Sequence, residues 1–326
     1  MSVLVTGGAG YIGSHVVHRL CAAGRAPVVI DSLVTGHRDA VPPGVPFLEA
    51  DVADRPRVAA FLAEHRVRAV LHFAALSVVG ESVTTPRRYY HGNLVASLAL
   101  LECVLDAGVP VFVLSSTAAV YGLPESTPIP ESHPTRPISP YGATKLALEQ
   151  ALAAYHHAYG LRYAALRYFN AAGAEASAGL GERHAPETHL VPLLLSVALG
   201  QRPDITVHGT DYDTPDGTCV RDYIHVCDLA DAHLAALDHL ENGGDSGALN
   251  LGTGTGHSVH EVVLAARRVT GHAIPVVYGP RRLGDPSILV ASPRLAEERL
   301  GFRPRRSDLD EIVRDAWAFH RAPRRP

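Results

Sequence analysis

The chain has 326 residues, of which 47% are apolar, and a formal net charge of -4. This length predicts an enzyme-sized globular protein with two lobes or one elaborated domain. The charge argues against a nucleic-acid binder, which usually carries a basic face, and the longest apolar stretch, residues 190–199, is too short to span a bilayer.

The cysteines and histidines predict neither disulfides nor a metal site. The four cysteines form no CxxC pair, and the first residues lack the features of a signal peptide, so we expect reduced thiols and a cytoplasmic location. Among the 19 histidines, His15 with His18 and His257 with His260 are pairs spaced i,i+3 without an evident third ligand. We therefore expect no metal.

A glycine-rich loop follows the first apolar run. Residues 3–6 predict a strand, residues 7–13 read Gly-Gly-Ala-Gly-Tyr-Ile-Gly, and residues 12–23 have a helical pattern. Such a turn lets a pyrophosphate approach the backbone at the start of a helix. Asp31 follows the next predicted strand, 27–30, where a carboxylate accepts hydrogen bonds from a ribose and repels a 2′-phosphate. These features predict an NAD site.

Strands and helices continue to alternate along the first half of the chain. We expect strands at 45–48, 69–72, 111–114 and 162–167, and helices at 56–65, 86–107 and 140–159. This alternation predicts an α/β fold with a doubly wound parallel (Rossmann) sheet over residues 1–170. Ligands bind outside the carboxyl ends of such strands. Residues expected to contact the cofactor there are Gly7, Gly10, Gly13, Asp31, Asp51, Val52, Phe73, Ala74 and Ala75.

Two positions in the chain allow more than one interpretation. Asn93 falls inside the predicted helix 86–107, where an amide is either solvated or bound to a partner, and we include it among the candidate cofactor ligands. Residues 252–256 are glycine-rich, but Ser258 and Glu261 form a separate capping box after them. We therefore interpret 252–256 as a turn.

Tyr141 and Lys145 carry the predicted chemistry. They are spaced i,i+4 on a helix that Pro140 opens, so they share a face. A nearby ammonium lowers the pKa of a phenol, which can then act as a base near neutral pH. Thr117 ends the preceding strand and offers a hydroxyl to the reacting oxygen. With an NAD site, these three residues predict hydride transfer to or from an alcohol.

The second half, residues 171–326, is expected to be a smaller α/β substrate domain, and part of 221–252 could pack back on the first. Residues 206–217 are rich in turn formers. The last predicted helix begins near 307–310, and its apolar face includes Trp317, which we expect in the core.

Five segments together resemble a known family. They are 7–13, 115–122, 141–145, 167–170 and 221–226, and the likeness extends from about residue 6 to 317. The chain resembles the extended short-chain dehydrogenase/reductases, and among them the 4-epimerases of UDP-glucose. The resemblance implies reversible 4-epimerisation of a UDP-hexose through a 4-keto intermediate, with tightly bound NAD, and it implies a homodimer that pairs helices 86–107 and 140–159.

The resemblance also implies site residues beyond those argued above. For the cofactor these are Tyr11, Ile12, Ser32, Ser115 and Tyr168, together with Tyr141 and Lys145. For the nucleotide sugar they are Thr117, Tyr141, Asn170, His189, Leu190, Thr206, His208, Arg221, Tyr223, Arg282, Asp285 and Leu289. Guanidinium groups such as those of Arg221 and Arg282 suit a diphosphate, and Asp285 suits a ribose diol.

Four residues depart from the family pattern. Ser77 stands near a position where many relatives carry lysine, His189 replaces a frequent asparagine, and His208 replaces a frequent aromatic residue. A histidine at 189 would make a phosphate contact sensitive to pH. Leu289 is smaller than the tyrosine of relatives restricted to glucose, so an N-acetyl group is expected to fit.

Other functions remain open at this point. The chain could be a 4-epimerase of UDP-GlcNAc and UDP-GalNAc or of another modified nucleotide sugar. A 4,6-dehydratase is disfavoured because Ala118 and Ala119, not an acidic pair, follow Thr117. A decarboxylase or a redox-inactive NAD-sensing protein would be further alternatives, the latter disfavoured by the intact Tyr141 and Lys145.

Overall fold

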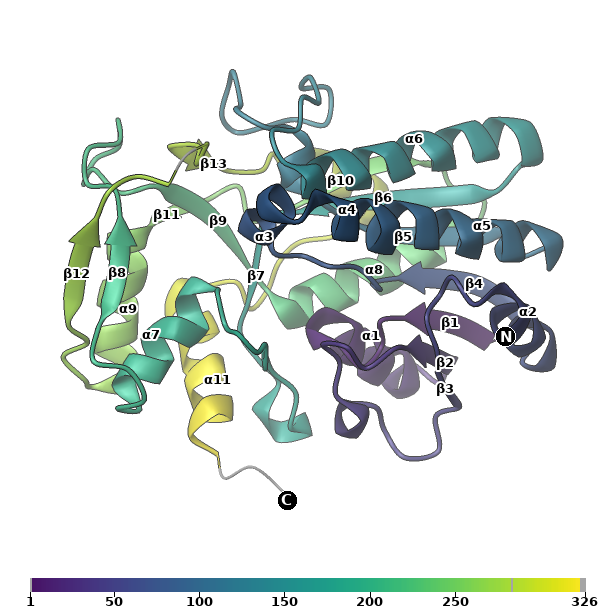
Figure 1. Cartoon of the computed structure of the whole chain (residues 1–326), viewed down its shortest axis with the longest axis horizontal. Helices are drawn as coiled ribbons and strands as arrows, with labels where there is room; N and C mark the ends of the chain where they lie inside the picture. Colours follow the sequence, from purple (N-terminus) through teal and green to yellow (C-terminus); the bar gives the residue numbers. More distant parts are fainter. Residues whose placement is uncertain (1, 283, 323–326) are drawn as a thin grey trace.

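The computed structural model describes residues 2–282 and 284–322. Within these residues, a parallel sheet of seven strands forms the centre of the larger part of the molecule (Figure 1). The strand order is β10-β6-β5-β4-β1-β2-β3. The strands are β1 Ser2–Thr6, β2 Ala26–Asp31, β3 Phe47–Glu49, β4 Val67–His72, β5 Val111–Thr117, β6 Arg162–Tyr168 and β10 Gly247–Leu251. The predicted doubly wound parallel sheet is confirmed.

Helices cover both faces of this sheet because side chains alternate along each buried strand. Val3 and Val5 face a core with α1 (Tyr11–Ala22) and α8 (Val226–Glu241). Leu4 faces the opposite core with α2, α5 and α6. These three helices span Arg55–Glu64, Ala96–Asp106 and Pro140–Tyr159. Burial on both faces explains the continuous apolar runs from which the strands were predicted.

The predicted helix at 86–107 is divided into three helical segments. The helix α4 (Pro86–Tyr89) leads into a π-helical turn, η2 (Tyr90–Val95), and then into α5. Asn93 lies in the π-helical turn, buried, with its side-chain amide bonded to the backbone of Leu76. A short helix that we had not predicted, α3 (Val79–Thr84), precedes this group.

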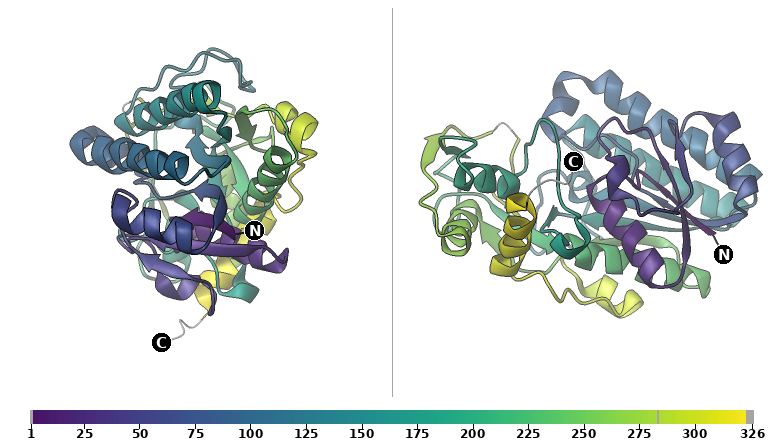
Figure 2. Two further views of the ribbon diagram at one scale, coloured as in Figure 1. Left: turned by 90° about the vertical axis from the view of Figure 1, so that its right-hand side faces the viewer. Right: turned by 90° about the horizontal axis from the view of Figure 1, so that it is seen from below.

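The chain leaves the seven-stranded sheet after β6 and builds a second group of elements (Figure 2). Its strand β9 (Val220–His225) pairs with β7 (Asn170–Ala172), β11 (Gly256–Ser258) and β13 (Ile288–Leu289). A two-stranded sheet joins β8 (Ile205–His208) to β12 (Val276–Gly279). The start of the segment expected to be turn-rich, 206–217, is therefore a strand.

Three helices enclose the core of this second group. They are α7 (Leu190–Ala198), α9 (Val259–Thr270) and α11 (Leu309–Arg321). Trp317 packs against this core while remaining partly exposed. The capping box of Ser258 and Glu261 at the start of α9 is confirmed. The remaining short elements are η1 Arg38–Ala40, η3 Ala118–Val120, η4 Ala176–Ala178 and α10 Arg294–Leu300.

Between β9 and β11 the chain returns to the seven-stranded sheet and adds α8 and β10 to it. Helix α8 packs beside α1, and β10 pairs in parallel with β6. The carboxyl ends of all seven strands consequently meet at one edge, with Thr6, His72 and Thr117 on neighbouring strands. Among the described residues, no helix is both long enough and apolar enough to cross a membrane.

Candidate active site

Tyr141, Lys145 and Thr117 meet where β5 ends and α6 begins. The Ser139 hydroxyl caps α6 by accepting a hydrogen bond from the Gly142 backbone at 3.2 Å. Lys145 is buried, and its Nζ donates to the backbone oxygen of Ser115 at 2.8 Å. The Tyr141 hydroxyl is hydrogen-bonded to Thr117. The structure therefore brings together the three residues that were predicted to carry the chemistry.

The pKa of Tyr141 differs from the expectation. Burial raises it to about 12, although the hydrogen bond with Thr117 lowers it. Burial also lowers the pKa of Lys145 to about 8, although Glu149 raises it. The expected lowering of the Tyr141 pKa by Lys145 is therefore wrong for the chain alone, because burial penalises a phenolate and an ammonium alike.

A buried polar network supports this site from behind. Arg167 on β6 donates from Nε to both carboxylate oxygens of Glu149, at 3.0 and 3.1 Å. Its Nη1 donates to the Tyr121 hydroxyl at 2.9 Å, and that hydroxyl donates to Asn250 Oδ1 at 2.7 Å. Ser116 also donates to Glu149. Four segments that are distant in sequence are thereby joined beneath Lys145.

The sequence analysis missed this network. Glu149 follows Lys145 by one helical turn, and Arg167 interrupts an apolar strand. A charged residue in a buried strand needs a partner. That was the available signal, but the sequence did not show which residue is the partner.

The glycine loop fits a dinucleotide phosphate. Gly7 has φ +70°, and a Cβ there would lie 2.6 Å from the Ala74 backbone nitrogen. A Cβ at Gly13 would lie 2.2 Å from the Gly7 oxygen. No side chain caps the start of α1 at Gly10. The loop therefore lies close to the ends of β1 and β4 and leads into a helix. The order of the strands changes direction between β1 and β4, and a Rossmann sheet binds a dinucleotide phosphate at such a point.

Asp31 ends β2 beside this loop. One carboxylate oxygen accepts from the Ala9 backbone at 2.9 Å and the other accepts from Leu33 at 2.8 Å. Burial raises the pKa of Asp31, while these two bonds lower it. Each oxygen can accept a second hydrogen bond, so the carboxylate still fits a ribose diol.

Other predicted cofactor residues have protein partners. The Asn93 amide exchanges hydrogen bonds with the Leu76 backbone, at 2.8 and 2.9 Å, so it orders the loop after β4. Its expected contact with the cofactor stays a prediction. The Tyr11 hydroxyl donates to the Gly173 oxygen at 2.7 Å, and Tyr168 bonds to the Ser115 hydroxyl. Ser32 and Asp51 are exposed, Val52 is buried, and Ile12, Phe73, Ala74 and Ala75 are intermediate.

On the substrate side, the structure brings five predicted residues together around β9. Asn170 pairs with Tyr223 across β7 and β9, and Leu289 pairs with Arg221 across β13 and β9. Leu289 also packs against the buried cluster directly after Thr117. Arg221 and Asp285 form an ion pair with each other. Their expected roles as phosphate and ribose ligands stay predictions, and in the chain alone each has the other as its partner.

A second substrate-side group lies on and beside the small sheet. Thr206 and His208 are on β8, and Arg282 follows β12 on an exposed segment. The His208 Nδ1 lies 3.3 Å from the Pro280 oxygen. Within the described chain we find no hydrogen bond or ion pair from this group to Tyr141.

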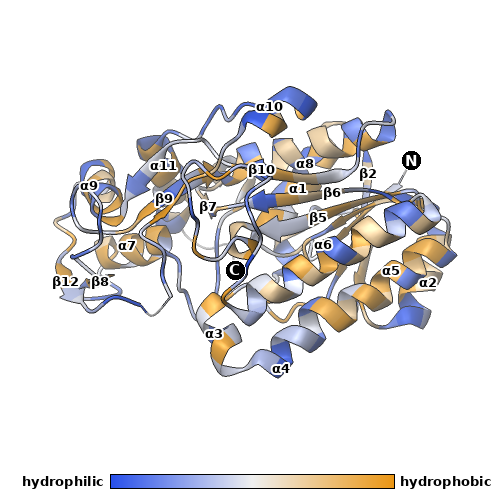
Figure 3. Ribbon diagram, turned by 90° about the horizontal axis from the view of Figure 1, so that it is seen from above, coloured by the Kyte–Doolittle hydropathy of each residue, from blue (hydrophilic) through white to orange (hydrophobic). Residues whose placement is uncertain are grey.

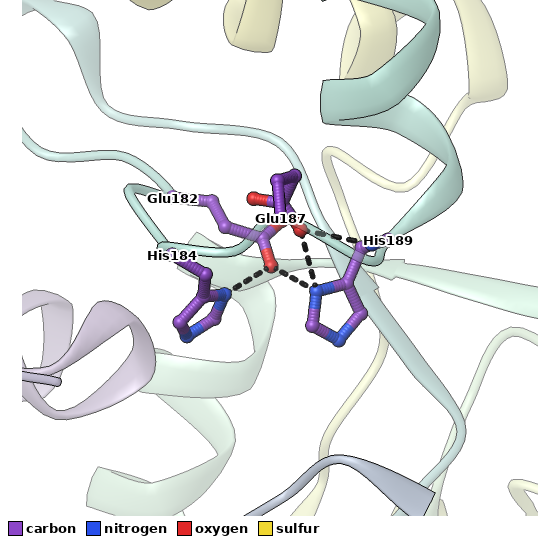
Figure 4. Close-up of side chains that lie close together, drawn as sticks. All are labelled: Glu182, His184, Glu187 and His189. Carbon is purple, nitrogen blue, oxygen red and sulfur yellow. Dashed lines mark hydrogen bonds and ion pairs between the residues drawn. The ribbon is translucent and has the colours of Figure 1, made fainter. Parts of the chain in front are cut away.

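His189 belongs to a cluster of four side chains just before Leu190 and α7 (Figure 4). Its Nδ1 lies 2.7 Å from a Glu182 oxygen and 3.0 Å from a Glu187 oxygen, and His184 Nδ1 lies 2.9 Å from Glu182. Burial lowers the pKa of His189, but the two carboxylates raise it to about 10. The expected pH sensitivity of His189 near neutral pH is therefore wrong for the chain alone.

Comparisons with known proteins agree with this architecture. Residues 3–252 match the NAD dependent epimerase/dehydratase family. The chain belongs to this family. A UDP-glucose 4-epimerase of Streptococcus mutans serotype c is 50% identical over 322 residues, which are 98% of this chain and 97% of that protein.

Two solved structures of the same family are similar throughout. The UDP-glucose 4-epimerase from Brucella ovis in complex with NAD has 49% identity and a TM-score of 0.94, with 97% of each chain covered. The UDP-glucose-4-epimerase from Stenotrophomonas maltophila, with bound NAD and formylated UDP-arabinopyranose, has 45% identity and a TM-score of 0.95, with 98% of each chain covered. The family assignment from sequence is confirmed.

Proposed function

We propose that the protein is a 4-epimerase that interconverts UDP-glucose and UDP-galactose with bound NAD. The observation that carries the proposal is the meeting of Tyr141, Lys145 and Thr117 at the end of β5. It is supported by about half identity over nearly the whole chain to UDP-glucose 4-epimerases.

Side chains of this protein transfer the proton, and the cofactor would transfer the hydride. Bound NAD would supply a hydride acceptor and, once reduced, a hydride donor for sugar C4, and its oxidised form would add a positive charge beside Tyr141. Tyr141 removes the proton of the 4-hydroxyl, and Thr117 hydrogen-bonds the same oxygen. Because burial alone raises the pKa of Tyr141, the base needs positive charge nearby, and Lys145 supplies part of it.

Inversion requires the 4-keto sugar to turn between the two proton transfers, so the nucleotide must hold the substrate. We assign this grip to Arg221, Arg282 and the Nε2 atom of His189 for the diphosphate. Asp285 suits the ribose. The remaining proposed substrate contacts are Asn170, Leu190, Thr206, His208, Tyr223 and Leu289.

The cofactor would occupy the edge formed by the first sheet. Gly7, Gly10 and Gly13 hold the pyrophosphate through the loop and the start of α1, and Asp31 holds the adenosine ribose. We propose residues 1–170, completed by α8 and β10, as the cofactor-binding part, with the second group of elements binding the nucleotide sugar.

The decisive experiment combines cofactor analysis with NMR. Protein purified without added NAD should contain it, and ¹H NMR should show conversion of UDP-glucose to UDP-galactose. Tyr141→Phe should lower turnover about 10²–10⁴-fold without releasing NAD. Tyr155→Phe, a tyrosine on the same helix outside the site, serves as control. Near-normal turnover by Tyr141→Phe would overturn the mechanism.

A second substrate is favoured by Leu289. This side chain is partly buried, packs beside the segment after Thr117, and is smaller than tyrosine. We therefore expect measurable turnover of UDP-GlcNAc in the same NMR assay. Conversion of UDP-glucose with none of UDP-GlcNAc would contradict this extension.

We also propose a homodimer formed through α3, η2 and α6. Apolar residues lie exposed on the first two elements, among them Val79, Val83 and Val95, and apolar stretches of α3 and α6 are visible in Figure 3. Light scattering should give a dimer mass, which Val83→Asp should lower. Val277→Asp, at an exposed valine on β12, is the control. A monomeric wild-type protein would contradict the proposal.

The cellular location that we propose is the cytoplasm. All four cysteines are unpaired, which suits a reducing compartment. Alkylation of the protein as isolated, followed by mass spectrometry, should find four free thiols, and a native disulfide would count against this location.

A further inference from the structure

The loop before α7 gathers four side chains that can each offer one metal-ligand atom. Glu182, His184, Glu187 and His189 occur within eight residues, and their ligand atoms all lie within 4.8 Å of one another. Figure 4 shows the Nδ1 of His184 turned towards Glu182 and the Nδ1 of His189 turned towards both carboxylates. The sequence analysis considered only His15–His18 and His257–His260 and therefore missed this cluster, whose spacing is Glu-x-His-x-x-Glu-x-His.

The cluster is buried at its centre and open at its side. The Glu182 side chain is only 4% exposed, whereas His184 and His189 are 27% and 41% exposed. A buried carboxylate requires compensation of its charge. One Glu182 oxygen faces both Nδ1 atoms, at 2.9 and 2.7 Å, and a Glu187 oxygen lies 3.0 Å from the Nδ1 of His189. An ion would have access from the histidine side.

One nitrogen atom in this cluster faces two carboxylates. The Nδ1 of His189 carries at most one proton, yet it faces oxygens of both Glu182 and Glu187. With both imidazoles in the neutral form that binds a metal, the two carboxylates carry two negative charges, and one divalent cation balances both. Binding requires unprotonated Nδ1 atoms, so the protons leave to solvent as the metal–nitrogen bonds form.

The surrounding backbone already orients one proposed ligand. A Glu187 oxygen accepts hydrogen bonds from the backbone nitrogens of Thr188 at 2.7 Å and His189 at 2.8 Å. Carboxylates that bind metals are commonly held by such outer hydrogen bonds. His189 is also the N-cap residue of α7, so a bound ion would tie the loop to the start of this helix.

We propose that Glu182, His184, Glu187 and His189 bind one divalent cation of the zinc type, through both Nδ1 atoms and one oxygen of each carboxylate. Two nitrogen and two oxygen ligands suit four-coordinate zinc, and four protein ligands form a closed, structural site. Mg²⁺ prefers oxygen ligands in octahedral geometry, so it is not the expected occupant. The site does not include Tyr141, and because it uses Nδ1 of His189 it leaves Nε2 for the diphosphate contact proposed above.

The test is zinc uptake by the full-length protein. After chelation, exchange into zinc chloride and desalting, elemental analysis should find about one zinc ion per chain. His184→Ala should weaken zinc affinity at least about tenfold in competition with a zinc indicator. His257→Ala removes a histidine of similar exposure (26%) that lies 3.9 Å from Glu261, and it should leave affinity unchanged.

A spectroscopic measurement keeps the proposal testable if His184→Ala fails to fold. Cobalt(II) added to the metal-free wild-type protein should give the intense visible absorption of a four-coordinate ion, and zinc should abolish it while magnesium should not. Absence of this absorption together with no zinc uptake would overturn the proposal. Zinc uptake that folded His184→Ala retains in full would overturn it as well.

Discussion

The two halves of the candidate site use charged side chains in different ways. Behind Lys145, the pair of Glu149 and Arg167 is buried and bonded on to Tyr121, so segments far apart in sequence are locked together. Around β9, the buried Arg221 pairs with Asp285, whose side chain is 26% exposed. The first arrangement is complete within the chain alone, whereas we propose that in the second Arg221 exchanges Asp285 for a diphosphate. On this proposal, the part around Lys145 holds the catalytic residues in fixed positions, and the part around β9 adjusts to the nucleotide.

The substitution Arg167→Met should give the largest loss of unfolding free energy, because it breaks the buried pair behind Lys145. It leaves Glu149 charged and buried without its partner, and we expect a loss of about 3–5 kcal/mol of unfolding free energy. Urea unfolding measures this loss. Arg303→Met, which removes an exposed ion pair with Glu297, is the matched control and should cost under about 1 kcal/mol. Equal losses of unfolding free energy in the two variants would show that the buried pair of Glu149 and Arg167 does not lock this part of the molecule.

The pH dependence of stability should report the burial of Lys145. Its pKa is lowered from 10.5 to about 8 in the folded protein, so between these values the unfolded chain binds more protons and stability rises with pH. Relative to Lys145→Met, the wild-type protein should gain on the order of 3 kcal/mol as pH rises from below 8 to above 10.5. Denaturant unfolding of both proteins across this range provides the measurement, and a constant difference would contradict it.

The glycine loop should tolerate less change than an open glycine. Gly13→Ala places a Cβ 2.2 Å from the Gly7 backbone oxygen, which forces the loop to shift and should cost about 1–3 kcal/mol. We also expect weaker retention of NAD on dilution. Gly80→Ala, in helix α3 with no atom within 4 Å of the new Cβ, should be neutral or slightly stabilising. If NAD is retained equally by both variants, the loop does not hold the pyrophosphate.

The smallest stability effect should come from Asp285→Asn. The Arg221 side chain is 10% exposed and that of Asp285 is 26% exposed, and the asparagine keeps an oxygen that can accept from Arg221, so unfolding free energy should change by about 1 kcal/mol. The KM for UDP-glucose should rise while kcat changes little, because the effect falls on nucleotide binding. Urea unfolding and steady-state kinetics check both parts. A loss of stability as large as that of Arg167→Met would show that this half is equally rigid.

The sequence predicts those features that depend on residues close to one another in the chain, and it misses contacts between distant residues. The strands, the glycine loop and the spacing of Tyr141 and Lys145 are local patterns. The alternation of strands and helices predicted a parallel sheet and therefore placed Thr117 at the edge where the strands end. The bond from Tyr121 to Asn250 joins residues 129 positions apart, and no local pattern identifies such a partner.

Other differences arise because side chains compete for partners. Asn93, Arg221 and Asp285 were assigned to ligands one at a time, yet the structure pairs each with another protein group. The pKa of Tyr141 was misjudged for a similar reason: spacing indicates that Lys145 is near, but only the packed structure shows how strongly burial opposes both charges. Neither effect is visible from residue types and spacing.

The return of the chain to form β10 sets a condition on biosynthesis. Strand β6 has no outer neighbour until residues 247–251 leave the ribosome, and Asn250 completes the network at Tyr121. A nascent chain ending near residue 170 therefore exposes an unpaired strand edge, which is a template for aggregation. The catalytic half cannot mature during synthesis until about three quarters of the chain has been made, so the second group of elements must emerge, and begin to fold, before the first is closed.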